Sequence, residues 1–250
     1  MSPGPAAPDV EIAQTREDLF GRAAKRFAQA AQEAVRKNGR FTVALSGGGT
    51  PRGFYELLAQ EPLAGEIPWD QCFFFWGDER AVPPEDPRSN YRMAKEAFLS
   101  GVPVPEANVF RFEAELPDHE EAARRYEAAL TKAFNLEDEG VPRFDQIWLG
   151  LGPDGHTASL FPGSRALDET ERLACANWAP SQNAWRLTLT YPVLDAAAEV
   201  VFLAAGEEKA EILRRIIKEG DRRLPAARVN PASGRLLWLI DRAAAKLLAQ

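Results

Sequence analysis

Apolar positions recur along the chain with two different spacings, which together predict helices and strands in alternation. A helical spacing first covers residues 16–37, with Leu19, Ala23 and Phe27 on one stripe, and Asn38-Gly39 ends it. The same spacing predicts further helices at residues 51–60, 89–99, 119–134, 207–218 and 242–248. Short continuous apolar runs predict strands at residues 41–45, 72–76, 144–149, 186–190, 200–204 and 236–240.

Strands that alternate with helices and are apolar throughout are typical of a largely parallel sheet covered on both faces. We therefore expect a three-layer α/β fold with a mostly parallel, open, Rossmann-like sheet and helices on both of its faces. The chain of 250 residues predicts a single domain over residues 1–250, with a flexible tail over about residues 1–15. The irregular segment 160–184 is expected to form a small subregion of that domain.

Composition narrows the possible partners and cofactors. The chain carries a net charge of −7 and has no long basic tract, which argues against nucleic acid as a partner. No apolar run is long enough to span a bilayer, and no secretory signal precedes the first helix, so a cytoplasmic protein is expected. Cys72 and Cys175 form neither a disulfide framework nor a Cys/His cluster, so no metal and no cofactor are predicted. No apolar stripe beyond those expected to face the core marks an interface between subunits, so we expect a monomer.

Four glycine-containing segments leave predicted strands or precede predicted helices at the same edge of the sheet. They cover residues 46–50, 77–80, 152–156 and 206–209. In open α/β sheets, ligands bind beyond the carboxyl ends of the strands. One site built from these four loops is therefore predicted.

The first of these loops suits a phosphate group. Glycines let backbone N–H groups turn toward an anion at the start of a helix, whose dipole favours negative charge. The loop lacks the Lys-Ser/Thr of a nucleoside-triphosphate loop and the spacing of a dinucleotide fingerprint, so a single phosphate fits it better. A tight turn that serves packing alone is the alternative. The predicted phosphate contacts are Ser46, Gly47, Gly48, Gly49 and Thr50.

Several cationic side chains lie near the same edge and are candidates to hold an anion: Arg80, Arg88, Arg92, Arg186 and Lys209. Lys209 falls in the first turn of its predicted helix, where the helix dipole disfavours a cation unless an anion binds there. A solvated surface lysine is the alternative for that residue.

His156 is the candidate base, because histidine titrates near neutrality and here lies in an open Gly-Pro-Asp-Gly turn. Asp154 either fixes the tautomer of this imidazole or caps the turn. Asp78 and Glu79 either divide acid and base roles or serve to orient Arg80. His119, at the start of a charged helix, is expected at the surface. No Gly-x-Ser-x-Gly elbow is present, which argues against a covalent serine hydrolase.

With these motifs in view, the chain resembles the 6-phosphogluconolactonase family, short bacterial type, which belongs to a larger group with glucosamine-6-phosphate deaminase. The matching segments, in order, are residues 45–51, 76–83, 89–91, 150–163, 186–194, 202–210 and 238–244. The resemblance implies hydrolysis of 6-phospho-D-glucono-1,5-lactone, with the sugar-phosphate lactone as partner.

The same resemblance implies roles for individual residues. His156 matches the family's proposed general base, and Asp78 and Arg80 match its Asp-Glu-Arg motif. The phosphate site corresponds to the loop Gly47 to Thr50 together with Arg80 and Lys209. How Arg80, Arg88 and Arg186 divide between the phosphate and the reacting carbonyl stays open.

Two rival functions remain to be weighed. In the deaminase pattern, the Asp-Gly-His motif is followed by Ile-Ala-Phe-Asn-Glu-Pro-Gly, whose glutamate moves protons. Here Phe161 occupies the position of that glutamate, and phenylalanine cannot transfer a proton. The second rival is a non-catalytic sugar-phosphate sensor, against which the presence of His156 with Asp78 and Arg80 argues.

Overall fold

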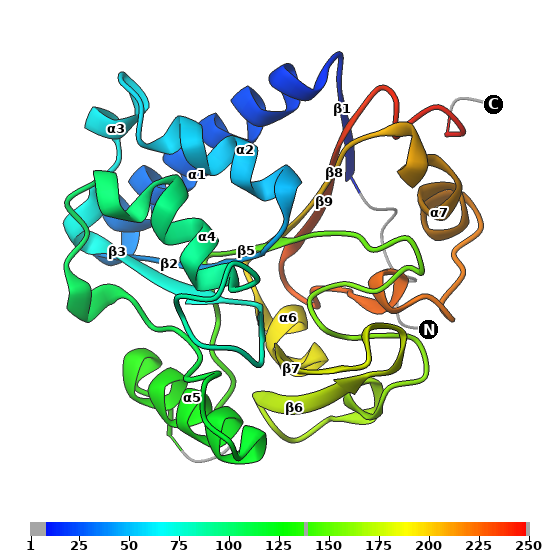
Figure 1. Ribbon diagram of the computed structural model, residues 1–250. Helices are drawn as coiled ribbons and strands as arrows, with labels where there is room; N and C mark the ends of the chain where they lie inside the picture. Colours follow the sequence, from blue (N-terminus) through cyan, green and yellow to red (C-terminus); the bar gives the residue numbers. More distant parts are fainter. Residues whose placement is uncertain (1–8, 138–139, 249–250) are drawn as a thin grey trace.

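A central sheet of six parallel strands organises the molecule, seen in the computed structural model of residues 9–137 and 140–248 (Figure 1). Its strand order is β1-β9-β8-β5-β2-β3, and all neighbouring strands in it are parallel. The strands are β1 (Asp9–Ala13), β2 (Phe41–Leu45), β3 (Cys72–Trp76), β5 (Gln146–Leu149), β8 (Glu199–Ala204) and β9 (Arg235–Asp241). The predicted fold class, a three-layer α/β fold with a mostly parallel open sheet, is confirmed.

A second, smaller sheet has the order β4-β7-β6 and is antiparallel. It consists of β4 (Asp78–Arg80), β6 (Ala174–Ala179) and β7 (Ala184–Leu189). The prediction that placed residues 186–190 in the parallel sheet is therefore wrong, because β7 pairs with β4 and β6 instead. The subregion expected at residues 160–184 contains β6, which its small side chains did not reveal.

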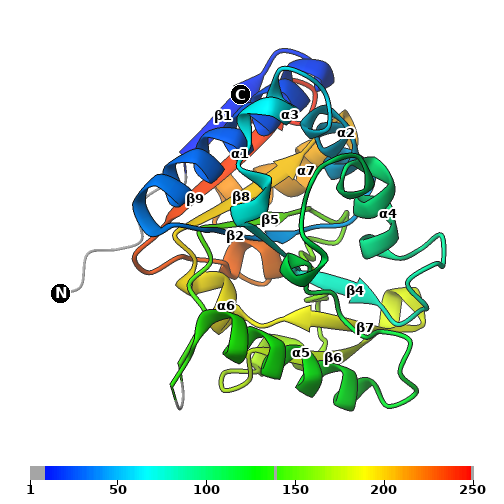
Figure 2. The same ribbon diagram turned by 90° about the vertical axis from the view of Figure 1, so that its left-hand side faces the viewer.

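Helices lie on both sides of the central sheet (Figure 2). They are α1 (Arg16–Asn38), α2 (Gly49–Leu58), α3 (Leu63–Glu66), α4 (Asn90–Ala97), α5 (His119–Phe134), α6 (Tyr191–Ala196) and α7 (Ala210–Leu213). The first four helices cover one face, whereas the small sheet and α6 lie over the other, with α5 packed outside the small sheet. Thr15 caps α1 by accepting from the Asp18 N–H, and Gly39 ends it with φ 75°.

Three predicted elements differ from the structure. Residues 9–13 belong to the expected flexible tail but form β1, which pairs along its whole length with β9; residues 1–8 lie outside the described residues. The helix predicted at 207–218 is divided into a 3-10 turn (Glu207–Lys209), α7 and a π-helical turn (Arg214–Lys218). Residues 242–248 form successive turns whose backbone hydrogen bonds span three or four residues, since so short a segment gains little from propagating a helix.

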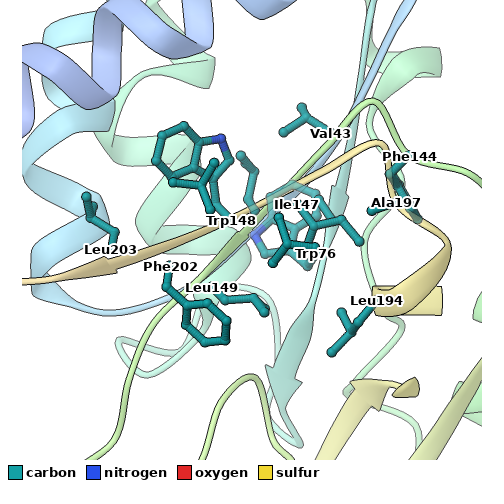
Figure 3. Close-up of a cluster of buried hydrophobic side chains, with 14 of the residues drawn as sticks. Val43, Trp76, Phe144, Ile147, Trp148, Leu149, Leu194, Ala197, Phe202 and Leu203 are labelled. Atoms are coloured by element: carbon teal, nitrogen blue, oxygen red, sulfur yellow. The ribbon is translucent and has the colours of Figure 1, made fainter. Parts of the chain in front are cut away.

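The core holds the central strands and thereby the loops at their carboxyl ends. Every residue of β2 and β5 is buried. Buried side chains gather from several strands and from the α6 region, among them Trp76, Trp148 and Phe202 (Figure 3). The Trp148 ring lies 4.5 Å from that of Phe54 in α2, and Phe202 stacks on Trp238 at 4.0 Å. Such close-packed strands give the loops beyond them rigid starting points. In the described part of the chain, no helix is both long and apolar enough to cross a membrane.

Candidate active site

The sheet order creates a switch point between β2 and β5. The chain continues from β2 outward to β3 on one side, whereas β5 pairs with the other side of β2. Connections that leave such a point in opposite directions open a crevice at the carboxyl ends of the strands. A cavity of about 350 Å³ lies at this place, as the four predicted loops imply. Its lining includes Ser46, Gly47, Gly48, Gly49, Thr50, Asp78, Arg80, His156, Arg186 and Lys209, together with Asn90, Ser159, Phe161 and Gln182.

The loop after β2 leads directly into helix α2. Gly48, with φ 107°, is the residue before the helix, and Gly49 begins it. The Tyr55 hydroxyl fixes the start of this loop, since it accepts from the Ser46 N–H and donates to the Ser46 carbonyl, both at 3.1 Å. The Ser46 hydroxyl itself is buried and has no hydrogen-bond partner in the described residues. An open helix N-terminus and an unused hydroxyl at a cavity are suited to an anion.

Arg80, Arg186 and Lys209 bring positive charge into the cavity. Within the described residues, none of the three forms an ion pair with a carboxylate. Arg80 and Arg186 are register partners across β4 and β7. Burial lowers the pKa of Arg186, and the positive charge of Arg80 lowers it further. A cluster of cations that form no ion pairs within the described residues, in a protein of net charge −7, is suited to an anionic ligand.

Arg88 and Arg92 do not bring their guanidinium groups to the cavity lining. Arg88 is exposed and pairs with Asp86 at 2.8 Å, and Arg92 pairs with Glu96 at 2.6 Å. The backbone carbonyl of Arg88, however, accepts a hydrogen bond from Nη1 of Arg80. The loop that carries Arg88 therefore contributes to the site by fixing Arg80.

His156 lies in the turn after β5 with its ring held on several sides. Its Nδ1 lies 2.5 Å from Oδ1 of Asp154, which also accepts from the His156 N–H at 3.1 Å. Partial burial acts to raise the pKa of Asp154, but its hydrogen bond with His156 and the charge of His156 leave that pKa below its ordinary value. The ring of Phe161 lies 4.3 Å from the imidazole. A Cβ added at Gly152 would come within 2.1 Å of the imidazole, so only glycine leaves room for the ring there.

The loop after α7 packs against the turn that carries His156. Gly155 has φ 80°, and the Ala226 N–H donates to its carbonyl at 2.9 Å. The Leu224 side chain packs so closely on Gly155 that an added Cβ would meet it at 2.8 Å. The backbone around His156 is therefore tied to the protein body.

The Asp78 side chain faces the cavity, whereas that of Glu79 faces the start of α4. The alternative in which these two residues divide acid and base roles is therefore wrong. Asp78 lines the cavity. Glu79 is buried and accepts from the Ser89 hydroxyl and from the N–H groups of Asn90 and Tyr91 at 2.7–3.0 Å, thus anchoring the start of α4. Burial raises the pKa of Glu79, these N–H donors act to lower it, and the nearby charge of Asp78 raises it again, leaving it above its ordinary value. Glu79 contacts the backbone N–H of Arg80, not its guanidinium.

Lys209 reaches the cavity from a 3-10 turn that follows Gly206. Gly206 has φ 98°, and its N–H donates to both carboxylate oxygens of Asp241 at 3.1 Å. The Asp241 carboxylate is buried at the end of β9 and also accepts from the Ala244 N–H at 2.8 Å. The end of β9 therefore fixes the start of the segment that carries Lys209.

Several cavity residues were not singled out from the sequence. Asn90 and Ser159 are almost fully buried polar side chains, and Gln182 lies in the turn between β6 and β7. Asn90 follows the helix-capping Ser89, a signal that marks a helix start but not a cavity residue. Ser159 lies in the matching segment after His156, where only the resemblance marked it. His119, expected at the surface, is half-buried and lies 5.5 Å from the Trp185 ring.

Comparison with known proteins agrees with this geometry. A family model described as glucosamine-6-phosphate isomerases/6-phosphogluconolactonase matches residues 14–238. The chain belongs to this family. It is 41% identical over 243 residues to a 6-phosphogluconolactonase of Synechocystis, covering 97% of this chain and 99% of the relative. It is 42% identical over 219 residues to the human 6-phosphogluconolactonase, covering 84% and 81% of the two chains.

Solved structures of family members share the fold. The 6-phosphogluconolactonase of Trypanosoma cruzi superimposes with a TM-score of 0.86 at 31% identity, covering 99% of this chain and 100% of that one. The Trypanosoma brucei enzyme of the same name gives a TM-score of 0.82 at 31% identity, covering 96% and 98%. A monomeric glucosamine-6-phosphate deaminase gives 0.78 at 25% identity, covering 96% and 99%. The family therefore includes members named for both chemistries.

Proposed function

We propose that this chain is a 6-phosphogluconolactonase, which hydrolyses 6-phospho-D-glucono-1,5-lactone to 6-phospho-D-gluconate. The observation that carries the proposal is one cavity in which an imidazole held by a carboxylate lies with three cationic side chains. The names of the relatives support it, since proteins called 6-phosphogluconolactonase match nearly the whole chain at 41% identity. The reaction is the second step of the oxidative pentose phosphate pathway.

The phosphate of the substrate binds to Lys209 and to the loop of Ser46, Gly47, Gly48, Gly49 and Thr50, which line the same cavity. Three features support this assignment: the open N-terminus of α2, the unpartnered Ser46 hydroxyl, and an ammonium group without a carboxylate partner in the described part of the chain. A phosphate far from the lactone carbonyl supplies binding energy that serves to position the reacting atoms.

His156 acts as the general base. The neutral imidazole takes a proton from water through Nε2 as the water oxygen attacks C1 of the lactone. Its Nδ1 faces Asp154, which fixes the ring orientation and stabilises the imidazolium that forms. The tetrahedral intermediate then collapses, the bond between C1 and the ring oxygen breaks, and the imidazolium returns the proton to that oxygen. A general base contributes about 10²- to 10⁴-fold to such a reaction.

Arg80 and Arg186 supply positive charge for the oxygen that becomes negative in the transition state and for the phosphate. The hydrogen bonds of Arg80 to the Arg88 carbonyl and of Arg186 Nη1 to the Trp185 carbonyl hold the two guanidinium groups before substrate arrives. Charge arranged in advance costs no reorganisation during the reaction. The contribution of Arg88 in this proposal is through its carbonyl.

Isomerisation with deamination, the other chemistry named in the family, is less well supported. That chemistry needs a proton-transferring glutamate where this chain has Phe161. The Phe161 ring lies 4.3 Å from the imidazole, where it packs against His156 and cannot exchange protons with it. Lactone hydrolysis needs only the base and the oxyanion contacts.

A direct assay tests the proposal. Freshly generated 6-phospho-D-glucono-1,5-lactone is added, and acid release is followed against the spontaneous rate in the same buffer. The wild type is expected to accelerate hydrolysis, and glucosamine 6-phosphate is expected to be released unchanged. If the wild type binds 6-phosphogluconate but leaves the lactone rate at the spontaneous value, the chain is a sensor and the proposal is wrong. If the His156→Ala variant keeps full activity, only the assignment of the base fails.

A further inference from the structure

Asp78 is held in the cavity by two neutral donors that come from different parts of the chain. Its Oδ2 accepts a hydrogen bond from the Ser159 hydroxyl at 2.6 Å, and its Oδ1 accepts from Nδ2 of Asn90 at 3.2 Å. The same Nδ2 also donates to the Asp78 carbonyl at 2.9 Å. In the described part of the chain, the Asp78 carboxylate has no ion pair with a cation.

These contacts lie in the interior of the protein. Ser159 is 1% exposed, Asn90 1% and Asp78 8%. A hydroxyl-to-carboxylate distance of 2.6 Å is typical of a charge-assisted hydrogen bond, which is stronger than a bond between neutral groups. The orientation of the carboxylate is therefore set by the protein before a ligand binds.

Ser159 is itself fixed by the small sheet. Its N–H donates to the Thr188 hydroxyl on β7 at 3.3 Å, and its carbonyl accepts from Nδ2 of Asn177 on β6 at 2.8 Å. Thr188 is in turn the register partner of Asp78 across β4 and β7. Ser159 thus connects the segment that carries His156 to the strand that carries Asp78 and Arg80.

The backbone before Ser159 has an uncommon conformation that directs it toward Asp78. Ala158 has φ 46°, in the left-handed region that residues other than glycine seldom adopt. The Leu160 N–H donates to the Thr157 carbonyl at 2.9 Å, which closes a tight turn around Ala158 and Ser159. Strained backbone of this kind is retained where the surrounding contacts require it.

We propose that Ser159 is a positioning residue that holds the Asp78 carboxylate as an acceptor for hydroxyl groups of the sugar. Each carboxylate oxygen has more than one acceptor site, so one donor on each oxygen leaves capacity directed at the cavity. Hydroxyl groups are the donors that a sugar offers to such an acceptor, whereas the phosphomonoester dianion of the substrate offers none. Ser159 would then affect recognition of the sugar and not of the phosphate. This inference rests on the proposed function, because it takes a phosphorylated sugar acid as the ligand.

The test separates the two parts of the ligand by measuring dissociation constants for 6-phosphogluconate and for inorganic phosphate. In the wild type, 6-phosphogluconate is expected to bind more tightly than phosphate. In Ser159→Ala, its dissociation constant is expected to rise by about 5-fold, the effect of losing roughly one hydrogen bond, while that of phosphate stays unchanged. The KM for the lactone is expected to rise with it, with the pH profile of kcat unchanged.

Two further variants exclude a general structural effect. Thr42→Val removes a buried hydroxyl that donates to the Asp145 carboxylate at 2.7 Å, far from the cavity at the start of β2. Thr42→Val also loses the bond that this hydroxyl accepts from the Asp145 N–H at 3.1 Å, so a fall in melting temperature at least as large as that of Ser159→Ala is expected, with unchanged ligand affinities. If Ser159 acts through Asp78, adding Ser159→Ala to Asp78→Asn changes the affinity for 6-phosphogluconate by less than about 2-fold, since contacts that share a partner are not additive.

The outcomes distinguish this inference from the proposed function. If the wild type neither accelerates lactone hydrolysis nor binds 6-phosphogluconate more tightly than phosphate, both fail. If it accelerates hydrolysis without that preference, only the inference fails. If the wild type accelerates lactone hydrolysis and shows that preference, but Ser159→Ala keeps it or weakens phosphate equally, only the role of Ser159 is overturned. An additive effect of Ser159→Ala in the Asp78→Asn background would also overturn it.

Discussion

Arg80 and Arg186 are register partners on β4 and β7, although both side chains carry a positive charge. Like charges directly opposite in an antiparallel pair destabilise a sheet. Burial lowers the pKa of Arg186, and Arg80 adds to that effect, so the folded protein holds this charge at a cost. A protein under selection for stability alone would not keep such a pair, whereas a site for a dianionic ligand needs it.

Replacing Arg186 by methionine therefore separates binding from stability. Arg186→Met is expected to raise KM for the lactone by about 10- to 100-fold, as expected for the loss of a charged hydrogen bond to the ligand. The free energy of unfolding is expected to stay equal or to rise by about 1 kcal/mol, because a half-buried like-charge contact disappears. Urea unfolding and steady-state kinetics measure the two effects.

Arg88→Met is the matched control, since this guanidinium pairs with Asp86 outside the cavity and only its carbonyl holds Arg80. We expect KM to change by less than about 2-fold, as is usual for an exposed ion pair. A KM increase in Arg88→Met equal to that in Arg186→Met would contradict the arrangement described above.

A second prediction concerns the His156 imidazole and the Asp154 carboxylate beside it. His156→Gln is expected to lower kcat by about 10²- to 10⁴-fold with little change in the affinity for 6-phosphogluconate. Asp154→Asn keeps the shape of the side chain but removes the negative charge beside Nδ1, so kcat is expected to fall less. Because contact with His156 leaves the pKa of Asp154 below its ordinary value, this carboxylate stays ionised throughout the neutral range. Steady-state kinetics at pH 7 compare the two variants, and a loss of kcat in Asp154→Asn as large as that in His156→Gln would contradict the roles assigned to the two residues.

A substitution at Gly152 tests the importance of the position of the His156 ring without replacing His156 itself. A Cβ at this residue would lie 2.1 Å from the imidazole, so Gly152→Ala must displace the ring of His156. We expect kcat to fall by about 10²-fold or more while the melting temperature changes little, because the ring borders a cavity.

Gly21→Ala serves as the control for the Gly152 variant. Gly21 lies inside α1, and nothing lies within 4 Å of an added Cβ. Alanine in a helix interior stabilises by about 0.5–1 kcal/mol relative to glycine, so Gly21→Ala should unfold at higher denaturant concentration with unchanged kinetics. Retained activity in Gly152→Ala would mean that the ring position is not critical.

The strands and loops that depend on local sequence were the parts of the fold that the hydrophobic pattern predicted. Residues 41–45 and 72–76 were predicted to the residue because continuous apolar runs bounded by polar or glycine residues are a strong strand signal. The four loops were placed correctly because the carboxyl ends of parallel strands share one edge. Of the five cations predicted near that edge, Arg80, Arg186 and Lys209 line the cavity, whereas Arg88 and Arg92 do not.

Other features depend on contacts between distant segments, which no local pattern contains. β4 is three polar residues long, and its pairing with β7 is what turns Asp78 to the cavity and Glu79 to the start of α4. β1 looked like part of a tail because only its pairing with β9 defines it. Sequence position did not distinguish Arg88 from Arg186 as a cavity residue. In the structure the Arg88 guanidinium binds Asp86 and so does not reach the cavity. No local pattern indicates that the side chains of Asn90 and Ser159 are buried at the cavity. Their positions depend on hydrogen bonds to Asp78, which is distant from Ser159 in the sequence.

Asp221 links pH to the stability of the loop behind His156. Its carboxylate accepts from Arg215 at 2.7 Å and from Arg223 at 2.8 Å, and its carbonyl accepts from the Leu224 N–H, which places Leu224 on Gly155. The hydrogen bonds from Arg223 and Arg215 hold the pKa of Asp221 far below its ordinary value of 3.8.

A carboxyl group with a lowered pKa in the folded state stabilises the fold above its unfolded value, and that contribution disappears as pH falls through the folded value. Asp221→Asn is therefore expected to melt at a lower temperature than the wild type at pH 7 and pH 5, with the difference shrinking only below about pH 4. Arg222, next in the chain, forms no ion pair in the described residues, so Arg222→Gln should match the wild type at each pH. Thermal unfolding from pH 3 to pH 7 measures the difference, and a gap between wild type and Asp221→Asn that instead widens toward acid would contradict the assigned role of these ion pairs.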